Sequence, residues 1–307
     1  MELKQLEQIL AIYQEKSITQ ASKKMYITQS ALNQQLLKLE KELGTPLFER
    51  RYHEMVPTYA GRIYLSAVQQ ILNIKRDTYK IINDIAHNDA GEISIAFTPE
   101  RGSLVFSFVY PLFQKEYPHY HFRTVEARVL RAGDLLLNGD VQLGMMTYSQ
   151  QNPLDPRLGK LDTGSETMVL AMPASHPLAH LAKGSTEDLP YIELSLLRNE
   201  KFILCSHETS FRKMIDFVFQ QNDFVPNILF ESASTLTILR MVRNQTGLAF
   251  IPESYVNKNL PIVYFHVEPL LSWTTCVAFL KGTYISAPEK RFVQLINENY
   301  SKMRGIL

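Results

Sequence analysis

Cysteine is scarce in this chain of 307 residues, which contains only Cys205 and Cys276. Two thiols so far apart argue against a disulfide framework or a cysteine zinc site. They suit the reducing cytoplasm, where we expect the protein to act. Long apolar runs are also missing, because none approaches the roughly 20 residues of a membrane span, and no secretory signal is visible. We therefore expect no membrane partner.

An excess of charge of either sign is missing too, since the formal net charge is +1. No global field attracts nucleic acid, so any affinity for DNA must come from a local basic patch.

Signatures of catalysis are absent from the sequence. It contains no G-x-G-x-x-G or G-x-x-x-x-G-K-[ST] phosphate loop and no G-x-S-x-G nucleophile elbow. His176 and His180 are four residues apart, but the intervening Pro177 and the lack of a third ligand nearby argue against a metal site. We expect no enzyme, no catalytic residue, no metal and no cofactor other than a small-molecule effector.

Three short helices are predicted at the N-terminus, over residues 3–14, 20–25 and 29–43. Thr19 and Thr28 are the expected N-caps of the second and third helices, because a threonine hydroxyl can accept an orphan backbone N–H. Gly44 and Pro46 should end the third helix. The buried stripe expected along it is Leu32, Leu36, Leu39 and Leu43.

The face of the third helix opposite its leucines is polar, and a basic β-wing is predicted over residues 48–57. Amide and hydroxyl groups can pair with base edges, and cations can bind the phosphates. Ordinary solvated surface is the alternative, but the order helix, turn, helix, wing favours docking in the major groove of DNA. The candidate DNA-binding residues are Thr28, Gln29, Ser30, Asn33, Gln34, Lys38, Arg50, Arg51 and His53.

These residues resemble the DNA-binding end of LysR-type transcriptional regulators. The family pattern has Ala-Ala or Ala-Ser in the second helix and Ser/Thr-Gln-Pro/Ser-Ala-Leu at the start of the third. Leu-Glu-x-x-Leu-Gly-x-x-Leu-Phe-x-Arg and Leu-Thr-x-Ala-Gly then follow. The matching runs here are residues 21–22, 28–32, 39–44, 47–50 and 57–61. The chain departs at Asn33, Gln34 and Pro57, where Ser, Arg and an aliphatic residue are usual.

A long connector helix is predicted over residues 60–88, after a DNA-binding domain of residues 1–59. Its apolar stripe needs a partner, which is either the chain's own C-terminal part or the same helix of a second copy. The resemblance implies the second, so we expect a homodimer or homotetramer. The main stripe is Ala60, Ile63, Ala67, Ile71, Ile74, Thr78, Ile81 and Ile85.

Strand-like and helix-like segments alternate after a short hinge at residues 88–91, which predicts an α/β domain with a parallel sheet and helices on both faces. The LysR resemblance implies two lobes similar to periplasmic binding proteins. Lobe one would comprise about 91–161 and 267–307, and lobe two about 162–266. The expected fold is therefore α/β, with an N-terminal all-α winged helix-turn-helix, a connector helix and a two-lobed effector domain over 91–307.

Ligands of open α/β sheets bind outside the C-terminal ends of the strands. Helix starts at Ser103 and Thr235 would present N–H groups there, which favours a small anion such as a carboxylate. In the alternative reading, the serines and threonines only cap helices, the arginines pair with Glu100 or Glu126, and His207 is an ordinary loop residue. The candidate effector-binding residues are Thr98, Glu100, Arg101, Ser103, Arg128, Thr147, Ser206, His207, Thr209, Ser232, Ser234 and Thr235.

The sequence thus predicts a ligand-responsive transcription regulator that binds double-stranded operator DNA and is expected to contact RNA polymerase. A small-molecule binding protein or transferase with an N-terminal assembly module is the alternative. A redox switch at Cys205 is a third possibility.

Overall fold

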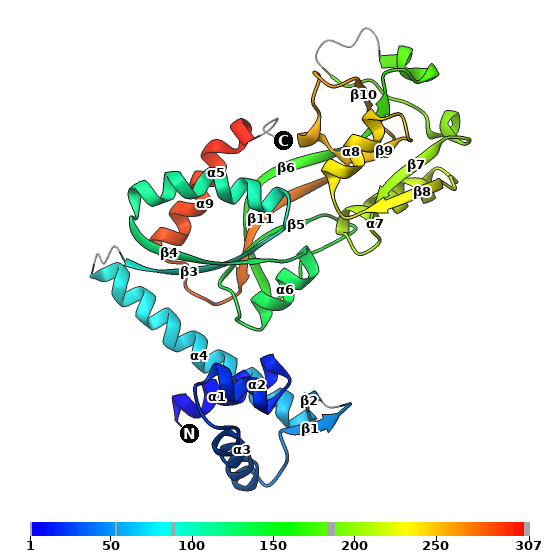
Figure 1. Cartoon of the computed structure of the whole chain (residues 1–307). Helices are drawn as coiled ribbons and strands as arrows, with labels where there is room; N and C mark the ends of the chain where they lie inside the picture. The colour runs from blue at the N-terminus through cyan, green and yellow to red at the C-terminus, as the bar shows by residue number, and fades with distance from the viewer. Residues whose placement is uncertain (1, 53, 87–89, 183–187, 304–307) are drawn as a thin grey trace. The chain divides into compact units, whose positions relative to one another are not determined.

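The computed structural model describes residues 2–52, 54–86, 90–182 and 188–303 (Figure 1). The chain divides into two compact units. One comprises Met1–Asn88 with Gly282–Ser286, and the other Asp89–Lys281 with Ala287–Leu307. No helix among these residues is both long and apolar enough to cross a membrane.

The N-terminal unit has the predicted three helices, hairpin and long helix. Its core is formed mainly by apolar side chains of the first three helices, among them Ile9, Ala21 and Leu36. The elements are α1 (Leu3–Glu15), α2 (Ile18–Lys24), α3 (Gln29–Leu43), β1 (Phe48–Arg51), β2 (Glu54–Pro57) and α4 (Tyr59–Ile85).

Two details of the helix prediction are wrong. Helix α2 begins before Thr19, and its N-cap is Ser17, whose hydroxyl accepts the N–H of Gln20. Ser and Thr two residues apart are equivalent as cap signals, so the sequence alone favoured neither. Leu43 at the end of α3 is 44% exposed, and the buried stripe therefore stops at Leu39.

Helix α4 confirms the predicted connector helix, and it buries only part of its apolar surface within its own unit. Leu65 and Val68 are buried within the N-terminal unit, whereas the main stripe is largely exposed in the single chain, with Ile74 at 66%. Tyr284, in the segment that belongs to this unit, donates its N–H to Asp77 at 3.0 Å and its hydroxyl to Asp84 at 2.9 Å. At about 1.5 Å per residue, α4 is roughly 40 Å long.

The predicted hinge is partly wrong. Ala90 and Gly91 belong to the first strand of the second unit, opposite His119 and Tyr120 of the neighbouring strand. Asn88 and Asp89 lie outside the described residues.

The second unit alternates helices and strands as predicted. Its helices are α5 (Arg101–Glu116), α6 (Val129–Leu137), α7 (Ser210–Gln221), α8 (Thr235–Arg243) and α9 (Ala287–Met303), with 3-10 turns η1 (Pro177–Ala182), η2 (Leu194–Leu197) and η3 (Glu253–Tyr255). Its strands are β3 (Ala90–Phe97), β4 (His119–Glu126), β5 (Leu143–Tyr148), β6 (Leu158–Pro173), β7 (Lys201–Cys205), β8 (Asn227–Ser232), β9 (Ala249–Pro252), β10 (Ile262–Phe265) and β11 (Ser272–Leu280).

The expected parallel arrangement holds for only part of the sheet. The main sheet has the order β10-β6-β11-β5-β3-β4, and β9 pairs with β6. Strand β3 is parallel to β4 and β5, but β11 is antiparallel to β5 and β6, and β6 is antiparallel to β9 and β10. Strands β7 and β8 form a separate parallel pair. The antiparallel ladders arise because two long strands, β6 and β11, cross between lobes.

Two hydrophobic cores define the two lobes. Lobe one consists of β3, β4, β5, α5, α6 and α9, and Figure 1 shows α5 and α9 side by side on one face of its sheet and α6 on the other. Lobe two consists of β7 to β10 with α7 and α8. Leu158 on β6 packs in a lobe-one core, while Met168 on the same strand packs in lobe two.

Candidate nucleic-acid interface and ligand cleft

The position of α3 is fixed by its cap and its leucines. The hydroxyl of Thr28 accepts the N–H of Ala31 at 3.2 Å, which confirms the predicted N-cap. Leu32, Leu36 and Leu39 are at most 3% exposed. These contacts hold the polar face of α3 in one orientation.

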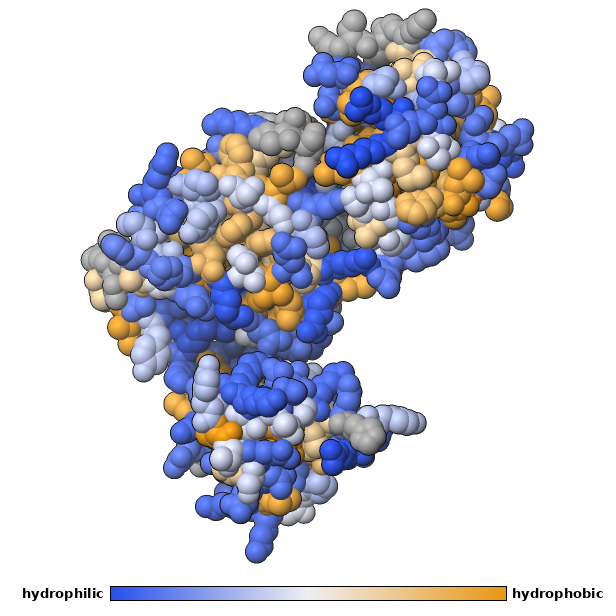
Figure 2. Space-filling view, in the orientation of Figure 1, coloured by the Kyte–Doolittle hydropathy of each residue, from blue (hydrophilic) through white to orange (hydrophobic). Residues whose placement is uncertain are grey.

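The predicted DNA-binding residues lie on that polar face and on the wing. Thr28, Gln29, Ser30, Gln34 and Lys38 are exposed, and Asn33 is half-buried. Hydrophilic residues dominate the visible surface of the N-terminal unit (Figure 2). Among the residues that the structure describes, none covers the exposed side chains of Gln29, Ser30 and Gln34, so these are accessible to a partner.

The wing is attached to α3 by a carboxylate. Glu40 on α3 accepts the N–H groups of Leu47 and Phe48 at 2.7 and 3.1 Å. Gly61, in the Thr-x-Ala-Gly run, lies so close to this segment that an added Cβ would be 1.9 Å from the Leu47 carbonyl oxygen. Close packing against the Leu47 carbonyl therefore explains why the family motif has a glycine at position 61.

Arg50 and Arg51 lie exposed on β1, and Arg51 forms an ion pair with Glu49 at 2.6 Å. No ion pair is found for Lys38 or Arg50 among the residues described. His53 lies outside the described residues. Exposed cations without an internal partner are suited to bind phosphate.

Two exposed tyrosines were missed by the sequence reasoning. Tyr26, in the turn before α3, is 96% exposed, and Tyr52, between β1 and β2, is 99% exposed. Both have positive φ, 53° and 48°. The sequence signal that could have identified them is a tyrosine in a tight turn next to lysines or arginines.

A cleft of about 480 Å³ lies between the lobes, where the ends of several strands converge. It brings together eight of the predicted effector residues and leaves out Ser103, Ser206, His207 and Ser232. The eight are Thr98, Glu100, Arg101, Arg128, Thr147, Thr209, Ser234 and Thr235.

The sequence reasoning missed much of the cleft's floor and its aromatic side. Glu166 lies in the middle of β6, Trp273 lies on β11 and Tyr255 lies in η3. Phe211 on α7 packs edge to face with Trp273, at 5.3 Å between ring centroids. These residues are not at the ends of parallel strands. The expectation that ligands bind outside the C-terminal ends of strands therefore did not identify them.

The predicted arginines are paired with different carboxylates from those expected. Arg101 binds Glu166, whose side chain is fully buried, and also donates to the Ser254 hydroxyl. Arg128 pairs with Glu208 across the cleft instead of with Glu126.

The start of α8 does not offer an open anion site, which corrects the expectation. The Ser234 hydroxyl caps the helix by accepting the Thr237 N–H at 3.3 Å. The Thr235 N–H donates to the Glu100 carboxylate at 2.9 Å. Ser103 is the third residue of α5, and the Thr98 hydroxyl accepts the N–H of Gly102 at 3.0 Å.

A buried arginine holds the loop beside the cleft. Arg212 on α7 bonds to Asp216, Glu231 and the Cys205 carbonyl oxygen, at 2.7, 2.8 and 2.9 Å. His207 is 2.9 Å from Glu231 and is not among the residues that line the cleft. Burial raises the pKa of the Cys205 thiol to about 11, and it raises that of Cys276 to about 12. Such thiols are poor nucleophiles, which weighs against the redox alternative.

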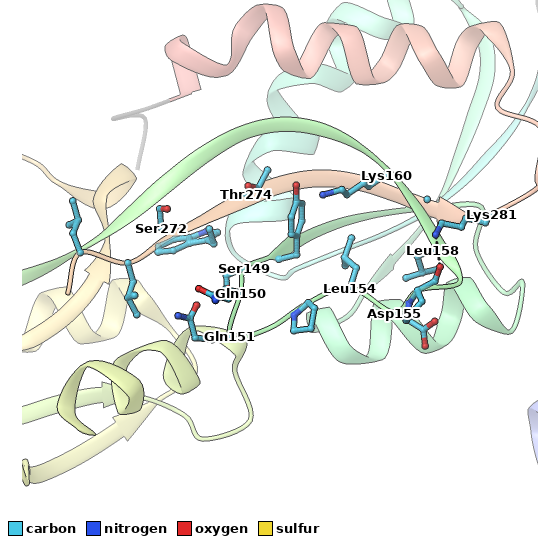
Figure 3. A pocket seen from close by; sticks show the side chains of 17 residues that line it. Ser149, Gln150, Gln151, Leu154, Asp155, Leu158, Lys160, Ser272, Thr274 and Lys281 are labelled. Carbon is cyan, nitrogen blue, oxygen red and sulfur yellow. Dashed lines mark hydrogen bonds between the residues drawn. The ribbon is translucent and has the colours of Figure 1, made fainter. Parts of the chain in front are cut away.

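A second cavity, of about 800 Å³, shares Tyr148, Ser149 and Trp273 with the cleft. In Figure 3, Lys160, Ser272 and Thr274 extend from the long strands, opposite Gln150 and Gln151. Its charged groups already have partners. Lys160 lies 3.4 Å from the Tyr148 ring centroid, and Lys281 donates to the Pro156 carbonyl oxygen. We therefore take the first cleft as the candidate ligand site.

A winged helix-turn-helix unit joined to a two-lobed α/β unit with a central cleft defines the class of ligand-binding transcription regulators. Residues 3–62 match the family "Bacterial regulatory helix-turn-helix protein, lysR family", and residues 86–301 match "LysR substrate binding domain". The chain belongs to the LysR family and is a DNA-binding transcriptional regulator with an effector-binding domain.

Similar proteins cover nearly the whole chain. The uncharacterized HTH-type transcriptional regulator YybE of Bacillus subtilis is 27% identical and covers 98% of this chain and 100% of its own length. A full-length OxyR variant of Pseudomonas aeruginosa has the same fold, with a TM-score of 0.69, 21% identity, and coverage of 100% of this chain and 98% of that one. The effector-binding domain of QuiR, in complex with shikimate, covers 69% of this chain and 98% of its own, with a TM-score of 0.56 and 19% identity.

Proposed function

We propose that the row from Gln29 to Gln34 reads operator base edges in the major groove. Gln29, Asn33 and Gln34 would pair with bases, adenine above all, while Thr28 and Ser30 contribute hydroxyls. Lys38, Arg50, Arg51 and His53 would bind phosphates and supply salt-dependent affinity. Support comes from the exposure of the row and from the rigid packing behind it.

The functional form that we propose is a homodimer or homotetramer joined through α4. Among the described residues, little covers the apolar stripe of α4, and Ile74 and Ile85 are 66% and 73% exposed. A second copy of the helix would bury it, and a symmetric pair of readers suits a palindromic operator.

The interlobe cleft is proposed to bind a small-molecule effector, as the QuiR effector domain binds shikimate. An effector that prefers one lobe arrangement would shift its population and so change operator binding. The regulator would act in the cytoplasm, contact RNA polymerase, and carry out no catalysis.

The observation that carries this proposal is the uncovered polar row on a capped, packed helix α3. The test is a fluorescence-anisotropy titration of the full chain with fragments of its own upstream DNA, against random DNA of equal length. One fragment should bind at least tenfold more tightly. Equal binding to all fragments would refute operator recognition and favour the small-molecule binding protein or transferase with an assembly module.

A further inference from the structure

The charged groups of the interlobe cleft are three carboxylates and two guanidinium groups. They are Glu100, Arg101, Arg128, Glu166 and Glu208. Both guanidinium groups are paired with carboxylates of the chain, Arg101 with Glu166 and Arg128 with Glu208. One carboxylate, that of Glu100, remains in excess. In the part of the chain that the structure describes, no basic side chain pairs with it.

Glu100 occupies the position where a ligand carboxylate would otherwise bind. Its oxygen accepts the Thr235 N–H at 2.9 Å, at the N-terminus of the nine-residue helix α8. The N–H of Thr237 is taken by the Ser234 hydroxyl. A helix N-terminus stabilises an anion, and here the chain supplies that anion itself. A ligand carboxylate at this place would meet a like charge.

The two guanidinium groups of the cleft are already paired with carboxylates of the chain. The Glu166 side chain is fully buried beside Arg101, and Ser254 adds a hydroxyl to the same guanidinium group. The Arg128 and Glu208 side chains are 41% and 79% exposed, so this pair lies in contact with water. Burial and the charge of Glu100 raise the pKa of Tyr255, whose phenol therefore remains neutral.

The remaining lining suits an apolar body. Phe211 and Trp273 form an edge-to-face pair, and Met214, Val129 and Leu130 complete the apolar side. Aromatic faces attract cations as well as apolar groups. Neutral hydrogen-bonding groups come from Thr98, Thr147 and Asn152.

From these contacts we propose that the cleft binds a small organic amine with an aromatic or branched aliphatic body, whose ammonium group pairs with Glu100. This proposal rests on the proposed role of the cleft as the effector site, and it specifies the ligand's charge. Glu100 both attracts the ammonium group and excludes carboxylates from the start of α8.

The test uses matched pairs that share a body and differ in charge. They are phenethylamine with 3-phenylpropionate, tryptamine with indole-3-propionate, and isopentylamine with 4-methylpentanoate. Thermal shift and calorimetry on the full chain should show binding by at least one amine, with a Kd at least tenfold below that of its carboxylate partner. A ligand that binds only the native form raises the melting temperature.

Glu100→Gln keeps an acceptor for the Thr235 N–H and removes the charge. It should raise the Kd of the amine at least fivefold. It should also reduce or reverse the preference for the amine over its carboxylate partner. Glu126→Gln removes the same charge outside the cleft lining. It should change neither the Kd of the amine nor the preference for the amine over the carboxylate. The wild-type comparison stands even if Glu100→Gln does not fold.

A carboxylate that binds as tightly as its amine partner would overturn the proposal, as would failure of every amine to bind at millimolar concentration. An unchanged preference in folded Glu100→Gln would also overturn it. Operator titrations on the same samples separate this failure from failure of the proposed function. Retained operator preference with no amine binding refutes the ligand class alone.

Discussion

Gln29 is the first residue of α3 and lies exposed at the end of the polar row. If its amide pairs bidentately with a base, Gln29→Ala should reduce discrimination between operator and random DNA by about 1–3 kcal/mol. That equals roughly a five- to 150-fold smaller affinity ratio. Anisotropy titrations of both DNAs at one salt concentration measure it.

Gln35→Ala is the matched control, because Gln35 is an exposed glutamine on the other flank of α3. It should leave the affinity ratio unchanged. Equal effects of the two substitutions would mean that Gln29 makes no specific base contact.

Cys205 makes the stability of the protein depend on alkaline pH. Burial raises the pKa of its thiol from the ordinary 9.0 to about 11. The native state therefore holds the proton more tightly than the unfolded state, so this stabilisation is complete below pH 9 and is lost between about pH 9 and 11. The loss from one such group is at most about 1.4 kcal/mol per pH unit.

Cys205→Ser removes the titrating group, so its free energy of unfolding should fall less steeply between pH 9 and 10.5. Urea unfolding of both proteins at several pH values measures the two slopes. Parallel slopes would contradict the assigned burial of the thiol.

Single residues were predictable where a local hydrogen bond decides the structure. Thr28 was identified as a cap because its hydroxyl can accept an orphan backbone N–H at the start of the predicted helix. The role of Glu100 was not predictable, because its partner, Thr235, is 135 residues away and is brought near only by the folding of both lobes.

At the scale of elements, the exposed stripe of α4 makes the sharpest prediction. Ile74→Lys places a charge where a second copy should pack, and Ile74 is 66% exposed in the single chain. The helix should stay folded, while the dimer weakens by about 1.5–3 kcal/mol per protomer from the lost apolar burial. Light scattering coupled to gel filtration measures the oligomer, and far-UV circular dichroism the helix.

Gln69→Lys introduces the same side chain on another face of α4, at a half-buried polar position. It should leave the oligomer intact. Dissociation by both variants, or by neither, would rule out the stripe as the interface.

Most elements were predictable from local patterns, but the strand β6 was predictable only in its second half. Its first half has Gly159, Lys160, Asp162 and Gly164, which read as a loop. Pairing with β11 makes it a strand, with Val277 opposite Leu161. Strand pairing between distant segments gives no periodic pattern in the local sequence. For the same reason, Glu166 on β6 and Trp273 on β11 were not identified as cleft residues.

At the scale of the whole molecule, the N-terminal unit has a core of its own, built from α1 to α4 and the wing. It should therefore fold without the remainder, although it would lose the bonds that Asp77 and Asp84 make to Tyr284. A chain ending at residue 88 should unfold cooperatively, with reduced stability at the end of α4.

This fragment should also keep the operator preference, since the row from Gln29 to Gln34 and the wing remain. Its affinity should be weaker than that of the full chain, and log K should still fall linearly with log salt, with a slope of about −0.9 for each phosphate contact. Anisotropy titrations at three salt concentrations compare the two proteins. A folded fragment without operator preference would mean that the α3 surface cannot read DNA by itself, and base recognition would then require residues beyond 88.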